Sequence, residues 1–176
     1  DEGPRIPDVE KIKSLNPAFV EGGSVTAATS SPFSLGASAL LITSESFAKE
    51  NGLTILGEIV SRAIAGVDWT RMGMGPIPAT NKALEKVGVT MDDIEIIELN
   101  EAFAAQALYV IQEGGWDAGK INLNGGAIAI GHPLGCSGTR IVGTLINAME
   151  QNDKHLGLAT MCIGTGQGIA TIIKRP

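Results

Sequence analysis

Cysteine is scarce in this chain, and so are histidine, aromatic residues and long hydrophobic runs. The only two cysteines, Cys136 and Cys162, are too few for a disulfide framework, and the low count favours a reducing compartment. No stretch reaches the roughly 20 continuous apolar residues that a transmembrane helix needs, so no membrane span is predicted. The cysteines and the two histidines, His132 and His155, also lack a paired spacing such as Cys-x2-Cys, and no metal site is predicted.

Positive charge is scarce as well. The formal net charge is −6 at pH 7 and the pI is near 4.9, so a phosphate backbone is repelled and nucleic-acid binding is not expected. The composition, 44% hydrophobic and 18% charged, predicts a soluble globular chain with the core of one ordinary domain.

The opening residues, Asp1-Glu2-Gly3-Pro4, read like the interior of a longer protein, and we expect the chain to be a fragment. It carries no recognisable signal peptide, which favours the cytoplasm. The mitochondrial matrix and the peroxisome stay open, because a longer protein would carry its targeting sequence upstream.

Turn residues and hydrophobic periodicity predict alternating strands and helices. The expected helices have apolar residues at helical spacing and cover residues 9–15, 76–87, 100–114 and 137–149. The expected strands are bounded by turn residues and cover residues 54–61, 94–99, 121–123, 157–162 and 167–173. A glycine-rich loop covers 125–138, and residues 164–166 join the last two strands in a tight hairpin. This order predicts an α/β fold with a mixed sheet covered by helices.

Three reactive side chains, Asn100, His132 and Cys162, stand at the ends of expected strands or in the loops that follow them. Open α/β sheets place their sites there. A nearby imidazole can poise a thiol for acid–base chemistry, which pairs His132 with Cys162. The amides of Gly164 and Gly166, just after Cys162, are free to point at an anion.

Each of these three residues also has a plainer explanation. A lone histidine is usually a satisfied structural residue, and a buried cysteine in a strand is usually a small hydrophobe. Asn100 could cap a helix, since Asn is a favoured cap residue. The functional alternative is an amide that holds a water or ligand, with Phe103 lining an apolar slot. Cys136 is a poorer candidate because it lies among small residues at a helix start.

Three sequence motifs then point to one family. They are Asn100-Glu-Ala-Phe-Ala-Ala-Gln106, Asn124-Gly-Gly-Ala-Ile-Ala-Ile-Gly-His-Pro-Leu-Gly135 and Met161-Cys-Ile-Gly-Thr-Gly-Gln-Gly168. Together they resemble the C-terminal signatures of the thiolases, in family order, with steps of 32 and 30 residues between Asn100, His132 and Cys162. The segments 17–19, 25–27 and 72–76 also fit, so the resemblance covers nearly the whole chain.

The resemblance implies a thiolase-like layered fold and acyl-CoA chemistry, with coenzyme A thioesters as substrates and no permanently bound cofactor. The reaction would be Claisen condensation of two acetyl-CoA molecules or thiolytic cleavage of 3-ketoacyl-CoA. In the family, a cysteine of the N-terminal half takes the acyl group, and His132 would activate that nucleophile. Cys162 would be the acid/base at the α-carbon, Asn100 would hold a water in an oxyanion hole with His132, and the Gly164 amide would help form a second hole.

Five more residues match family positions that line the pantetheine and acyl slot. They are Phe19, Ala27, Ser31, Met72 and Phe103.

The chain also departs from the family pattern. It has no third cysteine, so the acyl-accepting nucleophile is absent and we expect the chain alone to be inactive. Thr165 replaces a glycine usual after Cys162 and adds a Cβ where a left-handed or extended glycine conformation is expected. Thr29 stands where Asn is common and Leu35 where Asp is usual, which affects the loop on the CoA side.

The leading hypothesis is therefore the C-terminal part of an acetyl-CoA acetyltransferase or 3-ketoacyl-CoA thiolase. Residues 1–22 are expected to be the end of a loop or linker region, 23–50 the end of the N-terminal domain, and 51–176 the C-terminal domain. Its partner would be the N-terminal half, in the same or another chain, and a homo-oligomer is expected because the lost half leaves an apolar face exposed. The alternatives are a non-catalytic module that binds CoA or lipid, and an inactive structural remnant.

Overall fold

A computed structural model describes residues 3–176 of the protein, and its centre is one sheet of four strands with the order β1-β4-β3-β2. The strands are β1 (Glu58–Gly66), β2 (Ile96–Leu99), β3 (Leu156–Ile163) and β4 (Gln167–Lys174). β4 pairs antiparallel with both β1 and β3, whereas β2 pairs parallel with β3. The predicted mixed sheet is confirmed.

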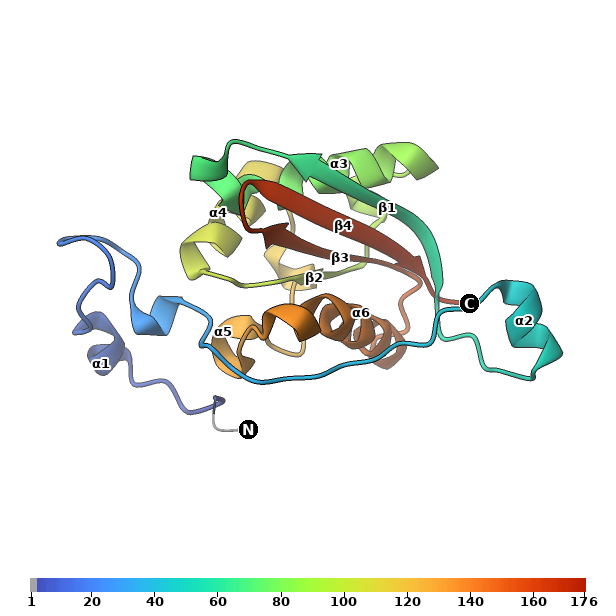
Figure 1. Ribbon diagram of the computed structural model, residues 1–176, viewed down its shortest axis with the longest axis horizontal. Coiled ribbons are helices and arrows are strands. Elements are labelled where there is room, and N and C mark those ends of the chain that lie inside the picture. The colour runs from blue at the N-terminus through green and yellow to red at the C-terminus, as the bar shows by residue number, and fades with distance from the viewer. Residues whose placement is uncertain (1–2) are drawn as a thin grey trace.

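Helices cover both faces of this sheet (Figure 1). The α-helices are α1 (Val9–Lys13), α2 (Glu45–Glu50), α3 (Pro76–Val87), α4 (Ala104–Gly114), α5 (Ala127–Ile130) and α6 (Leu134–Gln151). The short 3-10 helices are η1 (Ala27–Thr29), η2 (Trp69–Met74), η3 (Met91–Asp93) and η4 (Ala118–Lys120). α3 and α4 lie on one face and α6 lies on the other, while α1 and α2 lie at opposite ends of the molecule (Figure 1). The α/β layers expected from the sequence are confirmed.

Each face of the sheet has its own hydrophobic core. Under α3 and α4, the core includes Ala83, Val110 and Leu158, all buried. Under α6, the core includes Leu145 and Met149, also fully buried. The four residues of β2 are buried throughout, as expected for a strand covered on both faces.

Local sequence signals place α3 and the hairpin well. Pro76 occupies the first helical position, where its missing N–H costs nothing, and Gly88 ends the helix in the left-handed conformation with φ 69°. Ile163 and Gln167 face each other across the three-residue turn, so the predicted hairpin is confirmed.

Other predicted bounds are wrong. β1 covers Glu58–Gly66 instead of residues 54–61, because it extends along β4 until Gly66 faces Gln167. The expected strand at 121–123 is a single bridge from Ile97 to Ile121.

The helices near the candidate site also differ from the prediction. α4 begins at Ala104 and not at Asn100, α5 forms inside the expected glycine-rich loop, and α6 begins at Leu134, three residues before the predicted start. The small residues of these segments carry little periodicity, so tertiary packing decides their ends.

An extended segment, residues 31–43, has no regular secondary structure and runs along α6 on the side away from the sheet (Figure 1). The Ser38 hydroxyl donates to the Cys136 carbonyl at 2.8 Å. The amide of His132 donates to the Pro32 carbonyl at 3.3 Å. These contacts attach the extended segment to the start of α6 and to the loop before it.

In residues 3–176, no helix combines the length and the apolar character that crossing a membrane requires. The same residues contain no group of three or more His, Cys, Asp or Glu side chains placed to hold a metal ion.

Candidate active site

Asn100 and His132 meet at the edge of the sheet where β2 ends. The backbone amide of Asn100 donates to the Thr160 carbonyl of β3 at 3.0 Å, which anchors the residue to the sheet. Its side chain is 1% exposed, and Nδ2 lies 3.3 Å from Nε2 of His132. The helix-cap explanation for Asn100 is wrong, because Phe103 is the N-cap of α4.

His132 is held in a loop between α5 and α6. Gly131 precedes it with φ 96°, a conformation that favours glycine. Nδ1 of His132 lies 2.6 Å from Oγ of Ser137, one turn into α6. The Ser137 hydroxyl in turn donates to the Pro133 carbonyl at 3.1 Å.

These contacts determine which imidazole nitrogen carries the proton. The Nδ2 group of Asn100 can only donate, so Nε2 of His132 must accept. Nδ1 then carries the proton and donates it to Ser137, whose own hydrogen is directed at Pro133. Burial, and secondarily the nearby Arg140 guanidinium, lower the pKa of His132, which keeps this neutral form at neutral pH.

Cys162 lies near the end of β3, at the same edge of the sheet. Leu99 of β2 pairs with Thr160 of β3, and Cys162 follows two residues later on β3. The side chain is 6% exposed, and its burial raises the pKa of the thiol, an effect that a backbone hydrogen bond partly offsets. Among the described residues, no hydrogen bond joins this thiol to His132, whose ring nitrogens contact Asn100 and Ser137.

Gly164 begins the turn between β3 and β4, and no heavy atom would lie within 4 Å of a Cβ added there. The next residue, Thr165, has φ 68°, so of the two conformations expected there it adopts the left-handed one. Its hydroxyl donates to the Gly164 carbonyl at 2.6 Å. That carbonyl is therefore engaged, while the Gly164 amide remains the group predicted to face an oxyanion.

Two of the five slot residues lie close together. The amide and hydroxyl of Ser31 both donate to the Ala102 carbonyl at 3.0 Å, and Ser30 forms a β-bridge with Phe103. Ser31 and Phe103 thus flank the segment that carries Asn100.

The other three slot residues are spread over the surface. Phe19 is 74% exposed in the loop before η1, Ala27 is exposed at the start of η1, and Met72 is half-buried in η2. Their role in binding stays a prediction.

The two departures on the CoA side have different environments. The Thr29 hydroxyl accepts from the Thr26 amide at 2.8 Å and completes a capping box for η1. The Leu35 side chain is fully exposed in the extended segment, and nothing in the structure explains why leucine stands at this position.

Sequence reasoning missed Ser137, Arg140 and Glu98. Ser137 and Arg140 are three residues apart, so they project from one face of α6, and this spacing was the available signal for them. Glu98 interrupts the apolar run of β2, and an acidic residue in a strand covered on both faces was the signal for it.

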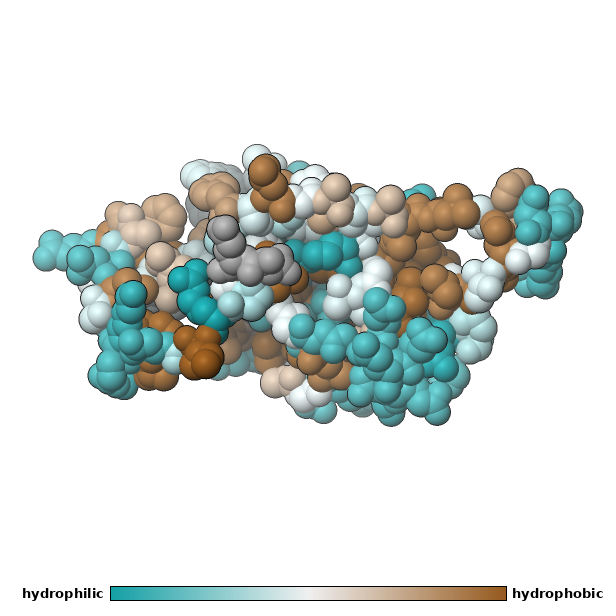
Figure 2. Space-filling view, turned by 90° about the horizontal axis from the view of Figure 1, so that it is seen from below, coloured by the Kyte–Doolittle hydropathy of each residue, from teal (hydrophilic) through white to brown (hydrophobic). Residues whose placement is uncertain are grey.

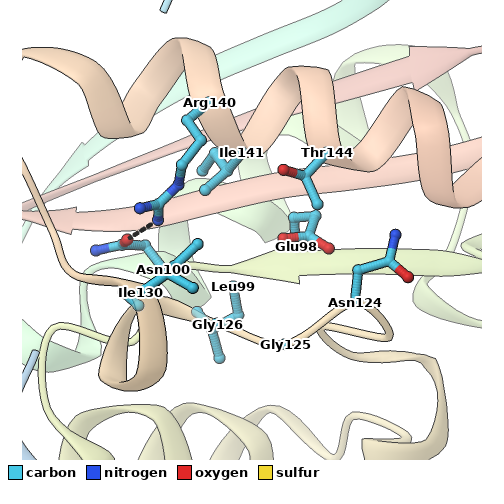
Figure 3. Close-up of a pocket in the computed structure, with 11 residues that line it drawn as sticks. Glu98, Leu99, Asn100, Asn124, Gly125, Gly126, Ile130, Arg140, Ile141 and Thr144 are labelled. Carbon is cyan, nitrogen blue, oxygen red and sulfur yellow. Dashed lines mark hydrogen bonds between the residues drawn. The ribbon is translucent and has the colours of Figure 1, made fainter. Parts of the chain in front are cut away.

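Glu98 and Arg140 line a cavity of about 190 Å³ behind Asn100, which Figure 3 shows. Asn124 and Thr144 add polar groups to its walls. Glu98 is 3% exposed, and its Oε1 has no hydrogen-bond partner among the described residues. Burial raises the pKa of this carboxyl to about 8; the Arg140 charge opposes the shift and Glu101 adds to it.

Two protein-family models match this chain. The family model for the thiolase C-terminal domain matches residues 53–175, and the model for the thiolase N-terminal domain matches residues 1–46. The chain belongs to the thiolase family. The division at residues 22 and 50 proposed from the sequence stays a prediction.

Individual thiolases match over nearly the whole chain. The 3-ketoacyl-CoA thiolase of Pseudoalteromonas atlantica is 59% identical over 170 residues, which are 94% of this chain and 44% of that protein. The 3-ketoacyl-CoA thiolase of Vibrio cholerae is 58% identical over 172 residues, with 96% and 44% covered. The chain therefore spans less than half the length of these curated thiolases.

Solved thiolase structures share the fold. The acetyl-CoA acetyltransferase of Bacillus anthracis superposes with a TM-score of 0.97 at 44% identity, covering 100% of this chain and 45% of that one. Human mitochondrial 3-ketoacyl-CoA thiolase in complex with CoA gives a TM-score of 0.94 at 40% identity, with the same coverage of 100% and 45%. The thiolase-like fold expected from the motifs is confirmed.

Proposed function

We propose that this chain is the part of a thiolase that supplies the proton-transfer and oxyanion-binding groups, acting on coenzyme A thioesters. The observation that carries the proposal is the contact between Asn100 and His132, at 3.3 Å, on the sheet edge where Cys162 also lies. The reaction is condensation of two acetyl-CoA molecules or thiolytic cleavage of 3-ketoacyl-CoA.

His132 acts as a base and then as a donor. Nε2 is the acceptor in the tautomer that its contact with Asn100 favours, so it can take the proton of a cysteine thiol and generate the thiolate that attacks the substrate carbonyl. Once protonated, Nε2 becomes a hydrogen-bond donor and can hold the thioester oxygen on which negative charge develops. Asn100 then releases Nε2 and binds a water that completes the oxyanion hole.

Cys162 acts at the α-carbon. In thiolysis, the C2–C3 bond of the 3-ketoacyl chain breaks, its electron pair stays on C2, and the Cys162 thiol protonates that carbon. In condensation, the thiolate removes the α-proton of acetyl-CoA. The raised pKa keeps Cys162 a thiol at neutral pH, as a proton donor must be. The Gly164 amide stabilises the oxygen of the carbonyl that is attacked.

The acyl-accepting cysteine must come from outside this chain, since Cys136 and Cys162 are its only cysteines. The test is co-expression of this chain with the N-terminal half of the Pseudoalteromonas atlantica 3-ketoacyl-CoA thiolase, followed by an acetoacetyl-CoA thiolysis assay. We expect activity from the pair and none from the chain alone. A pair that copurifies, is folded and has no activity contradicts the proposal.

Matched variants separate catalysis from folding. His132→Ala and Cys162→Ala should each lower the activity of the pair by about 100-fold or more, the usual contribution of a general acid or base. His155→Ala, at an exposed histidine, and Cys136→Ala, at the other buried cysteine, should leave most of it. Equal losses of activity in His132→Ala and His155→Ala, or in Cys162→Ala and Cys136→Ala, would mean that the substitutions act through folding.

Binding of CoA without turnover is the alternative, and the left-handed Thr165 next to Gly164 favours it, because a β-branched residue there alters the predicted oxyanion turn. Calorimetric titration of the co-expressed pair with CoA distinguishes the two. Micromolar binding with no thiolysis, unchanged by Thr165→Gly, would establish a binding module.

A further inference from the structure

Arg140 joins the two chain segments that carry Asn100 and His132. From α6 its Nη1 donates to the Gly131 carbonyl at 2.7 Å, and its Nη2 donates to Oδ1 of Asn100 at 3.5 Å. Figure 3 shows the guanidinium directed at the Asn100 amide across the cavity wall. One half-buried cation thus contacts both the end of β2 and the loop before α6.

The contact with Asn100 has a direction. A guanidinium can only donate, so it favours the amide rotamer that turns Oδ1 toward Arg140 and Nδ2 toward His132. The opposite rotamer would place two donors face to face and would require a proton on Nε2 of His132. The orientation of one amide therefore sets which imidazole nitrogen is protonated.

The charge of Arg140 is not neutralised by an acidic neighbour. Among residues 3–176, no salt bridge to Arg140 is found. Glu98, which lines the same cavity, has a pKa raised to about 8 and stays protonated at neutral pH. The positive charge of Arg140 thus acts on Asn100 and on His132. Burial is the larger cause of the lowered pKa of His132, and the Arg140 charge lowers it further.

We propose that Arg140 is a positioning residue: by orienting the Asn100 amide, it keeps the proton on Nδ1 of His132 and leaves Nε2 free to act as a base. The hydrogen bonds then run in one direction, from Arg140 through Asn100, His132 and Ser137 to the Pro133 carbonyl. The catalytic consequence rests on the proposed function, whereas the proton arrangement does not.

The test is ¹⁵N NMR of the His132 ring in the full chain, in a His155→Gln background that leaves His132 as the only histidine. The spectrum reports which ring nitrogen carries the proton and how the ring titrates. We expect the Nδ1–H form in the parent and a mixture of both tautomers in Arg140→Met, with a raised His132 pKa. Arg140→Lys, which keeps the charge, should restore part of the parent spectrum.

Two controls keep the test decisive. Arg175→Met removes a guanidinium that also donates to a backbone carbonyl, that of Met149 at 2.8 Å, and should leave the His132 spectrum unchanged. Asn100→Asp replaces the amide donor by an acceptor and must place a proton on Nε2, even if Arg140→Met fails to fold. The proposal is wrong if folded Arg140→Met keeps the parent tautomer and titration, or if Asn100→Asp does.

The same variants assayed in the co-expressed pair separate this inference from the proposed function. We expect Arg140→Met to lower kcat roughly 10-fold to 100-fold with little change in KM, the size of effect seen when a reacting group is misplaced. An inactive parent pair whose His132 spectrum responds as expected would overturn the function and leave the inference standing. An active parent pair whose His132 spectrum does not respond to Arg140→Met would overturn the inference and leave the proposed function standing.

Discussion

Nδ2 of Asn100 and Nε2 of His132 lie 3.3 Å apart, although 32 residues separate them in the chain. Neither residue belongs to a helix or strand: one follows β2 and the other precedes α6. Their meeting depends on the parallel pairing of β2 with β3 and on the packing of α6 against the sheet. The site is therefore a property of the sheet edge and not of either motif alone.

Thr165→Gly should stabilise the chain by about 1 kcal/mol, because a β-branched residue at φ 68° carries a steric cost that glycine lacks. The hydrogen bonds of the Thr165 hydroxyl are exposed and oppose this gain only slightly. Urea denaturation measures the change.

Thr165→Asn is the graded control, since Asn tolerates the left-handed conformation better than Thr but less well than Gly. Its unfolding free energy should fall between the other two. A Thr165→Gly variant that is less stable than the parent would show that the hydroxyl contacts matter more than the backbone.

Local signals predicted α3 and the hairpin almost to the residue, because Pro76, Gly88 and the 164–166 turn act within a few positions of the chain. The start of β1 was misplaced because its extent depends on β4, about a hundred residues away. Motifs also singled out Asn100 and His132 as candidates, and the structure places the two side chains 3.3 Å apart. Arg140 had no local signal strong enough to link it to Asn100. That link exists only after α6 packs on the sheet, so no local pattern could reveal it.

Gly168→Ala should destabilise the chain by about 2 kcal/mol or more. A Cβ on Gly168 would overlap the Gly75 carbonyl and the Pro76 nitrogen, which are backbone atoms at the start of α3 and cannot move independently. Thermal unfolding measures the loss.

Gly143→Ala is the matched control for that substitution. Gly143 lies inside α6 and a Cβ there would meet nothing within 4 Å. Alanine should raise stability by up to about 1 kcal/mol through helix propensity. Equal effects at Gly143 and Gly168 would argue against close backbone packing between β4 and α3.

Exposed apolar side chains gather on and beside the extended segment, and they include Phe33, Leu35, Leu41, Ile42 and Leu134. Figure 2 shows apolar surface next to the end of the molecule where α2 lies. Surface of this kind favours association. We expect the isolated chain to bind an apolar dye and to self-associate as its concentration rises, measured by sedimentation velocity.

Phe33→Ser combined with Leu35→Ser should reduce both signals, and Leu108→Ser, an exposed leucine on α4 across the sheet, should not. Addition of the N-terminal thiolase half should reduce dye binding further. A parent chain that stays monomeric and binds no dye contradicts the expectation of a homo-oligomer.

Glu98 should make stability depend on pH in an unusual direction. The pKa of Glu98 is about 8 in the folded chain, against 4.5 for an ordinary Glu, so the folded state holds a proton that the unfolded state has released between these values. The contribution of Glu98 to the unfolding free energy is therefore fully present below pH 4.5. It falls by up to roughly 1.4 kcal/mol per pH unit as pH rises toward about 8.

Glu98→Gln removes this titration and keeps the size of the side chain. The parent and the variant should have similar stability near the acid end of the window, and the variant should become the more stable of the two toward its alkaline end. Glu95→Gln is the matched control of opposite sign, because a hydrogen bond from the His155 amide, opposed by burial and aided by one from the Leu156 amide, lowers the pKa of Glu95. The stabilisation that Glu95 supplies is lost as pH falls, so the Glu95→Gln difference should shrink at acid pH. Parallel curves for the parent and Glu98→Gln across the window would mean that Glu98 is ionised in the folded chain, and that the cavity behind Asn100 holds a carboxylate facing Arg140.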